Sequence, residues 1–161
     1  MNNWDAYFLN ICIVVASNSK CLSRKLGAII VRDKSIVSVG YNGPPRGVPQ
    51  CNQWPDYIQK YGDDILCPRR HMGYKTGEGM EFCPAAHAEA NAINNAARNG
   101  VNVYNTTMYM NCPKSCSKCL TAIINSGIKE IVVTKDESKY ESDISDYMIE
   151  TSGLKVREYS L

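Results

Sequence analysis

What this sequence lacks already excludes several classes of protein. Its 161 residues carry a formal net charge of only +2, too little for the strong positive field typical of nucleic-acid or membrane-surface proteins. It has no apolar run long enough to cross a bilayer, no basic region followed by an apolar core at its start, and no lipidation motif at its end. We expect a cytoplasmic protein that binds no membrane and forms no stable complex with nucleic acid.

The chain also has no internal repeats and no low-complexity tail. Its length fits one domain with a core of its own, over residues 1–161. Within it, the stretch at about 43–83 is rich in glycine, proline, cysteine and charged residues and has weak periodicity. An irregular insert of that length usually carries function or is held by another group, and we expect a second metal ion to hold this one.

Apolar periodicity predicts the order of helices and strands. Residues 4–16 show helical spacing, and the apolar runs 26–31 and 36–39 flank a turn at 32–34 as in an antiparallel hairpin. Further helices are predicted at residues 87–99, 116–126 and 144–151, and further strands at 107–110, 131–134 and 154–157. This alternation predicts an α/β fold, with a mixed central sheet of about five strands covered by helices.

Eight cysteines are many for a chain of this size with no secretory signal, and they favour metal binding over disulfides. They are Cys12, Cys21, Cys51, Cys67, Cys83, Cys112, Cys116 and Cys119. Cys12 lies within an apolar helical stretch, so we interpret it as a small buried hydrophobic residue instead.

The pattern His87-x-Glu89 followed by Cys116-x-x-Cys119 is the strongest functional signal. One histidine and two cysteines can supply three zinc ligands and leave the fourth tetrahedral position for water, which is typical of a catalytic site. H-x-E with C-x-x-C is the signature of zinc-dependent nucleobase deaminases, in which a metal-activated water attacks the ring and the glutamate moves protons. We therefore predict a catalytic Zn²⁺ at His87, Cys116 and Cys119, with Glu89 as the proton shuttle.

A zinc-stapled interaction module without catalysis is the alternative from another functional class. Cys112 is near enough in sequence to supply a fourth ligand and close the site, and Glu89 would then be an ordinary solvated helix residue. A closed site leaves the H-x-E spacing unexplained, so we favour the enzyme.

Longer stretches around both motifs resemble the deoxycytidylate (dCMP) deaminases. They are residues 23–31, 40–47, 83–93, 96–100, 108–110 and 116–119. H-x-E with C-x-x-C specifies only the wider cytidine deaminase superfamily, and the G-Y-N-G-x-P-x-G run at 40–47 narrows it. The resemblance implies a three-layer α/β/α fold of the cytidine-deaminase type and zinc-dependent hydrolysis of dCMP to dUMP and ammonia, which supplies dUMP for thymidylate synthesis.

Related deaminases of dCTP, of another cytosine or adenine nucleoside, or of a tRNA base are the alternatives within the same chemistry. A tRNA deaminase should carry a more basic surface than a net charge of +2 provides. A pterin or guanine deaminase would share the zinc site and lack the G-Y-N-G run.

The resemblance also implies how the substrate is held. Asn42 would bond the sugar hydroxyl, although an Asn-Gly pair is also typical of a turn. Ser23 and Lys25 are candidates for the 5′-phosphate, with a solvated loop as the alternative. Ala88 and Ser115 complete the predicted substrate site, the carbonyl of Ser115 helping to hold the departing amine. At Ser115 the chain departs from the superfamily pattern, which usually has proline before the first cysteine.

Regulation by nucleoside triphosphates is a further implication. In the family, dCTP activates and dTTP inhibits, each bound with Mg²⁺ between the subunits of a homohexamer. Arg46 would contact phosphate, a role that suits a guanidinium group. The predicted effector residues are Gly43, Arg46, Gly47 and Arg98. Alone, this loop is typical of a plain turn, and Arg98 of a solvated cation near a helix C-terminus.

A second, structural zinc is implied for the insert. Positions matching Cys21 and Cys51 contribute to it in several deoxycytidylate deaminases. Cys67, His71 and Cys83 compete for the remaining ligand places, and the C-x-x-x-H spacing of Cys67 and His71 suits one zinc. Free thiols and a surface histidine are the alternative.

Overall fold

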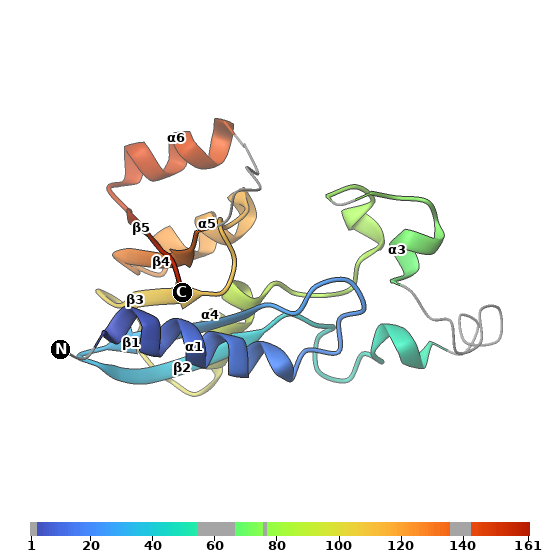
Figure 1. Cartoon of the computed structure of the whole chain (residues 1–161), viewed down its shortest axis with the longest axis horizontal. Coiled ribbons are helices and arrows are strands. Elements are labelled where there is room, and N and C mark those ends of the chain that lie inside the picture. Colours follow the sequence, from blue (N-terminus) through green and yellow to red (C-terminus); the bar gives the residue numbers. More distant parts are fainter. Residues whose placement is uncertain (1–2, 55–66, 76, 136–142) are drawn as a thin grey trace.

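A computed structural model describes residues 3–54, 67–75, 77–135 and 143–161. It confirms the three-layer α/β/α fold: a mixed five-stranded sheet lies between helices on both faces (Figure 1). The strands are β1 (Gly27–Arg32), β2 (Ser35–Tyr41), β3 (Thr107–Met110), β4 (Glu130–Thr134) and β5 (Lys155–Tyr159). The helices are α1 (Trp4–Ser17), α3 (Pro68–His71), α4 (Ala88–Arg98), α5 (Ser117–Asn125) and α6 (Asp143–Ser152), with short 3₁₀ turns η1 (Cys51–Gln53) and η2 (Met80–Phe82).

The sheet has the strand order β2-β1-β3-β4-β5. β1 pairs antiparallel with β2 and with β3, whereas β3, β4 and β5 are parallel. The predicted β1–β2 hairpin is present, and Asp33 and Lys34 at its tip have φ values of 49° and 63°. Two successive positive φ angles are those of the turn that matches the twist of paired strands, which explains a tight hairpin without glycine.

One face of the sheet is covered by α1. Phe8, Leu9 and Cys12 of this helix pack against a cluster that includes Ile29 of β1 and Val132 of β4. Cys12 is fully buried, and burial raises the pKa of its thiol to about 12. Its interpretation as a small core residue is therefore confirmed.

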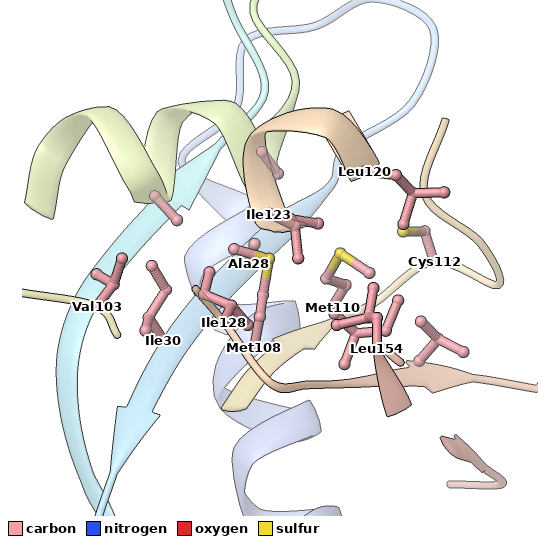
Figure 2. Close-up of a cluster of buried hydrophobic side chains, with 14 of the residues drawn as sticks. Ala28, Ile30, Val103, Met108, Met110, Cys112, Leu120, Ile123, Ile128 and Leu154 are labelled. Atoms are coloured by element: carbon pink, nitrogen blue, oxygen red, sulfur yellow. The ribbon is translucent and has the colours of Figure 1, made fainter. Parts of the chain in front are cut away.

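The opposite face is covered by α4 and α5, with α6 alongside. Figure 2 shows this core, in which Leu120 and Ile123 of α5 lie over Met108 and Met110 of β3. All four side chains are fully buried. This packing places the N-terminus of α5 next to that of α4.

Two glycines let the helices approach the sheet closely. A Cβ on Gly27 of β1 would lie 2.3 Å from the carbonyl oxygen of Cys12 in α1, and one on Gly40 of β2 would lie 2.2 Å from the backbone nitrogen of Ala92 in α4. The inner face of α4 is correspondingly lined by the small side chains of Ala88, Ala92 and Ala96. The sheet thus fixes the position of α4.

The described parts of the insert, with η1, α3 and η2, extend to the right of the sheet in Figure 1. Residues 55–66 and 76 of the predicted insert lie outside the described residues. No helix in the described part of the chain is long and apolar enough to cross a membrane.

Candidate active site

Two helix N-termini bring the predicted zinc ligands together. His87 is the N-cap of α4, Cys116 is the N-cap of α5, and Cys119 lies in the first turn of α5. The Nδ1 atom of His87 lies 3.4 Å from the Sγ of Cys116 and 3.4 Å from the Sγ of Cys119. Because both helices begin at these residues, the positive end of each helix dipole lies at this point.

The three ligand atoms have the spacing that zinc requires. Tetrahedral bonds of about 2.3 Å to sulfur and 2.0–2.1 Å to nitrogen place nitrogen and sulfur about 3.6 Å apart, close to the observed 3.4 Å. Among the described residues, this is the one group of three whose ligand atoms all lie within 4.8 Å of one another. The residues therefore fit a zinc ion with three protein ligands.

Cys112 does not join this group. Its side chain is buried in the core on the α5 face, and its Sγ lies 3.9 Å from the carbonyl oxygen of Lys114. Burial raises the pKa of the Cys112 thiol well above its ordinary value. Cys112 is not in the group of gathered ligand atoms, which favours the three-ligand site over a closed site with Cys112 as the fourth ligand.

The three ligand side chains are joined to one another by hydrogen bonds, and a bound cation would take the place of the shared protons. Hydrogen bonds from the Cys119 thiol and from His87 lower the pKa of the Cys116 thiol well below its ordinary value. The same contact with Cys116 raises the pKa of His87 and of Cys119. Metal binding requires deprotonated thiols and a neutral imidazole, and a dication supplies the positive charge that these protons now provide.

Glu89 lies in the first turn of α4, two residues after His87. Its side chain is 4% exposed, and its Oε1 accepts a hydrogen bond of 2.5 Å from the Oγ of Ser115. The sequence predicted the place of Glu89 beside the metal ligands. It gave Ser115 only a carbonyl role, and the contact of its hydroxyl with Glu89 was missed, because a serine before a cysteine carries no such signal.

The loop after β2 is joined directly to the metal site. The backbone N–H of Gly43 donates to the carbonyl of Ala86 at 3.1 Å, and the N–H of Ala86 donates back to Gly43 at 2.9 Å. Asn42 is 8% exposed; its Oδ1 accepts from the N–H of Leu26 at 2.8 Å, and its Nδ2 donates to the carbonyl of Arg24 at 2.9 Å. Asn42 and Gly43 together therefore join the segment before β1 to the segment before His87.

The turn in this loop lies later than the Asn-Gly pair. The N–H of Val48 bonds the carbonyl of Pro45 at 3.0 Å, whereas the N–H of Asn42 bonds Leu26 at 3.1 Å and extends the β1–β2 pairing. The turn alternative for Asn42 is therefore wrong: Asn42 directly follows the end of β2 at Tyr41, and the turn residues that follow are Arg46 and Gly47.

The remaining predicted substrate residues lie on the same side of the fold. Ser23 and Lys25 are exposed in the segment that Asn42 holds, and Ala88 is the buried first residue of α4. Sequence reasoning missed Asn111, which follows β3. Its Oδ1 accepts from the N–H of Gly27 at 2.7 Å, and its Nδ2 lies 3.5 Å from the carbonyl of Lys25. It therefore supports this segment from the other side.

The predicted effector residues are divided. Gly43 is buried beside Ala86, whereas Arg46, Gly47 and Arg98 are exposed. Arg46 reaches α4, where its Nη2 donates to Asn95 Oδ1 at 3.0 Å. Arg98 is three residues further along the helix, so it lies on the same face of α4 as Asn95.

Three further cysteines lie near enough to Cys51 to act on its thiol, and they come from the insert and from the segment before β1. Cys51 lies in η1, Cys67 precedes α3, and Cys83 follows η2. Burial and the neighbouring thiols of Cys83, Cys67 and Cys21 raise the pKa of Cys51 to about 11. His71, the other candidate ligand, is the last residue of α3. In the described residues these sulfurs are less tightly gathered than the ligands around His87.

Comparison with known proteins agrees with this geometry. Residues 2–135 match the model of the cytidine and deoxycytidylate deaminase zinc-binding region. The deoxycytidylate deaminase of Schizosaccharomyces pombe is 31% identical over 98% of this chain and 44% of its own length, so the chain spans less than half of that relative. The deoxycytidylate deaminase of Mycobacterium phage D29 is 34% identical over 83% of this chain and 96% of its own.

A solved structure has the same fold. The dCMP deaminase of cyanophage S-TIM5, crystallised in complex with dCMP and dUMP, superposes with a TM-score of 0.71 at 20% identity and covers 99% of both chains. At that identity the likeness concerns the arrangement of the sheet and helices.

Proposed function

This chain belongs to the cytidine and deoxycytidylate deaminase family, and we propose that it hydrolyses dCMP to dUMP and ammonia. The observation that carries the proposal is the meeting of His87, Cys116 and Cys119 at two helix N-termini, with Glu89 buried beside them. Three ligands with an adjacent carboxylate serve hydrolysis, whereas a structural zinc needs four ligands and no carboxylate. The product dUMP would feed a methyl-transferring enzyme of thymidylate synthesis.

Zinc held by His87, Cys116 and Cys119 would lower the pKa of a water to about 7, so that its oxygen can add to the amine-bearing ring carbon. Glu89 would accept the proton released from this water and deliver it to the ring nitrogen beside that carbon. It then helps transfer a proton to the amine, so that the carbon–nitrogen bond breaks and a carbonyl forms as ammonia leaves. The carbonyl of Ser115 and the backbone at Ala88 hold the base during these transfers.

The sugar and phosphate contacts follow the loops around this centre. In this proposal Asn42 bonds the sugar hydroxyl with the acceptor capacity its amide oxygen retains beyond the bond from Leu26. Ser23 and Lys25 bind the 5′-phosphate. The tie between Asn42 and the segment before β1 supports this assignment, because it joins both parts of the site.

A second zinc is part of the proposal. We assign it to Cys21 and Cys51, with Cys67, His71 and Cys83 competing for the remaining ligand places; the influence of the Cys83, Cys67 and Cys21 thiols on Cys51 supports a common site. Four cysteine or histidine ligands form a closed structural site, which would order an insert with little apolar surface of its own.

Regulation is proposed on the loop 43–47 and the end of α4. Mg²⁺-bound dCTP would activate and dTTP would inhibit, with Arg46, Gly43, Gly47 and Arg98 contacting the effector in a homohexamer. The bond from Arg46 to α4 supports a path to the active site, because Glu89 lies on the same helix. A titration of purified enzyme with either triphosphate that leaves the rate unchanged refutes this part.

The main experiment measures ammonia release from dCMP, dCTP, cytidine and a tRNA substrate, together with zinc content per chain. We expect dCMP to be preferred and two zinc ions to be bound. Preference for another substrate favours the related deaminases, and no release from any substrate favours the zinc-stapled module.

The substitution Glu89→Gln separates enzyme from module. Glutamine keeps the size of the side chain and loses the proton-accepting carboxylate, so we expect kcat to fall at least about 10²- to 10⁴-fold with zinc content unchanged. Glu150→Gln on α6, an exposed glutamate, is the matched control and should behave as wild type. Full activity in the Glu89→Gln enzyme contradicts the mechanism.

A further inference from the structure

The hydroxyl group of Ser115 contacts the Glu89 carboxylate inside the proposed active site. Its Oγ donates to Glu89 Oε1 at 2.5 Å, within the range of a charge-assisted O–H···O⁻ hydrogen bond. Both side chains are buried, with 1% of Ser115 and 4% of Glu89 exposed. A carboxylate removed from water needs hydrogen-bond donors, and within the described residues Ser115 is the side chain that supplies one.

The surroundings of the hydroxyl fix the direction of this bond. Ser115 Oγ carries one hydrogen and lies 2.5 Å from Glu89 Oε1 and 3.8 Å from the Sδ of Met110. A thioether is a weak acceptor, so the serine hydroxyl hydrogen points to the carboxylate. Met110 is fully buried in β3 and limits rotation of the serine side chain. The hydroxyl is therefore held in place to donate.

The bond also connects the two halves of the metal centre. Glu89 is in the first turn of α4, two residues after His87, and Ser115 directly precedes Cys116. Ser115, next to the ligand Cys116, thus orients the carboxylate of Glu89, which lies on the helix that begins after the ligand His87. Proline, the usual residue before the first cysteine, has no side-chain donor, so this chain provides a contact that the usual pattern does not.

We propose that Ser115 is a positioning residue for the proton transfers of Glu89, an inference that rests on the proposed deaminase function. Its hydrogen bond occupies Oε1 and leaves Oε2 as the oxygen that accepts and returns the proton. When Oε2 is protonated, Oε1 remains an acceptor, so the bond persists through both transfers. The carboxylate keeps one orientation, and no reorganisation accompanies the reaction.

Substitution of Ser115 by alanine removes the donor. We expect kcat to fall about 10- to 100-fold, the effect of one hydrogen bond to a charged group, while KM and zinc content remain those of wild type. Ser115→Thr keeps a hydroxyl group and should be faster than S115A. The matched control is Ser117→Ala, the same change on the other side of Cys116, which should leave kcat unchanged.

The proposal is overturned if S115A has the kcat of wild type, or if its loss of kcat is proportional to its loss of zinc. It is also overturned if the threonine variant is no faster than the alanine variant. Crystal structures of zinc-loaded wild type and S115A give a readout independent of activity. We expect the Glu89 carboxylate to turn or lose its defined position in S115A, and an unchanged carboxylate overturns the proposal.

The wild-type substrate panel separates failure of this inference from failure of the proposed function. If wild type accepts dCTP or cytidine rather than dCMP, the substrate assignment fails and the kinetic comparison of Ser115 variants is made on the accepted substrate. If wild type deaminates none of them, the proposed function fails, and the two crystal structures alone decide whether Ser115 positions Glu89.

Discussion

Gly40 of β2 tests how the sheet fixes the helix that carries the active site. A Cβ at this position would lie 2.2 Å from the nitrogen of Ala92, 2.5 Å from the carbonyl oxygen of Ala88 and 2.7 Å from the carbonyl carbon of Asn91. Ordinary contacts of a Cβ begin at 3.4 Å. All three atoms are backbone, so no side chain can rotate away, and α4 must move by about 1 Å to relieve the overlap in Gly40→Ala.

The expected destabilisation follows from this overlap. Overpacking a core costs about 1–3 kcal/mol and occasionally more. A clash with the backbone of a helix belongs at the upper end, so we expect Gly40→Ala to lose about 3 kcal/mol or more of unfolding free energy. For a chain of this size that loss corresponds to a fall in Tm of about 6–12 °C. Because His87 begins α4, zinc retention should fall as well.

Denaturant unfolding of zinc-loaded protein measures the loss, and zinc per folded chain measures the effect on the site. Gly43→Ala is the matched control, since its Cβ would meet nothing nearer than Gln50 Oε1 at 3.8 Å; its stability should stay within about 0.5 kcal/mol of wild type. Adding Ala92→Gly to Gly40→Ala should restore nothing, because the overlap is with a backbone nitrogen. A Gly40→Ala protein as stable as Gly43→Ala refutes the reasoning.

Two further substitutions test the periphery of the fold and the insert. Arg157 donates to Asp5 at 2.6 Å and thereby lowers the pKa of its carboxyl below the ordinary 3.8. The bond therefore stabilises the fold above pH 3.8 and is lost as the pH falls through the lower folded-state pKa. We expect Asp5→Asn to lose about 1 kcal/mol at pH 7 and to match wild type at the acid end of a denaturation series; a constant difference contradicts this. For the insert, we expect Cys51→Ser to reduce zinc from two ions per chain to one and to retain the catalytic ion, and unchanged zinc content contradicts a cysteine site.

Local chemistry made much of the fold predictable. The strand predicted at 107–110 is β3, and the helices that follow His87 and Cys116 begin one residue after each. Apolar spacing and glycine stops determine such elements within a few residues of sequence. The metal ligands were predictable for a related reason: their chemical identity and short spacings carry the signal without knowledge of the packing.

Contacts that depend on packing were not predictable. Ser115 and Glu89 are 26 residues apart, and they meet only because α4 and α5 lie side by side on one face of the sheet. Asn111 supports the segment before β1 because β3 pairs with β1, an order that periodicity does not encode. The turn alternative for Asn42 failed for the same reason, since pairing with Leu26 extends the hairpin beyond its apolar run.

The position of α4, and with it the geometry of the candidate site, depends on hydrogen bonds between α4 and the edge strand β2. The side chains of Asn91 and Asn95 donate to the carbonyls of Tyr41 and Val39 at 2.7 and 2.8 Å, and Ser38 Oγ donates to the carbonyl of Ala92 at 2.6 Å.

β2 is an edge strand, so these bonds both satisfy polar groups of the edge and fix the helix that begins after His87. The cysteine ligands are instead positioned by β3, because Cys116 and Cys119 lie on the segment that follows this strand and begins α5. The ligands therefore meet only when β2, β1 and β3 are paired and both helices are packed. Zinc bound at this point stabilises the folded sheet as well as the site, because the unfolded chain cannot reproduce its geometry.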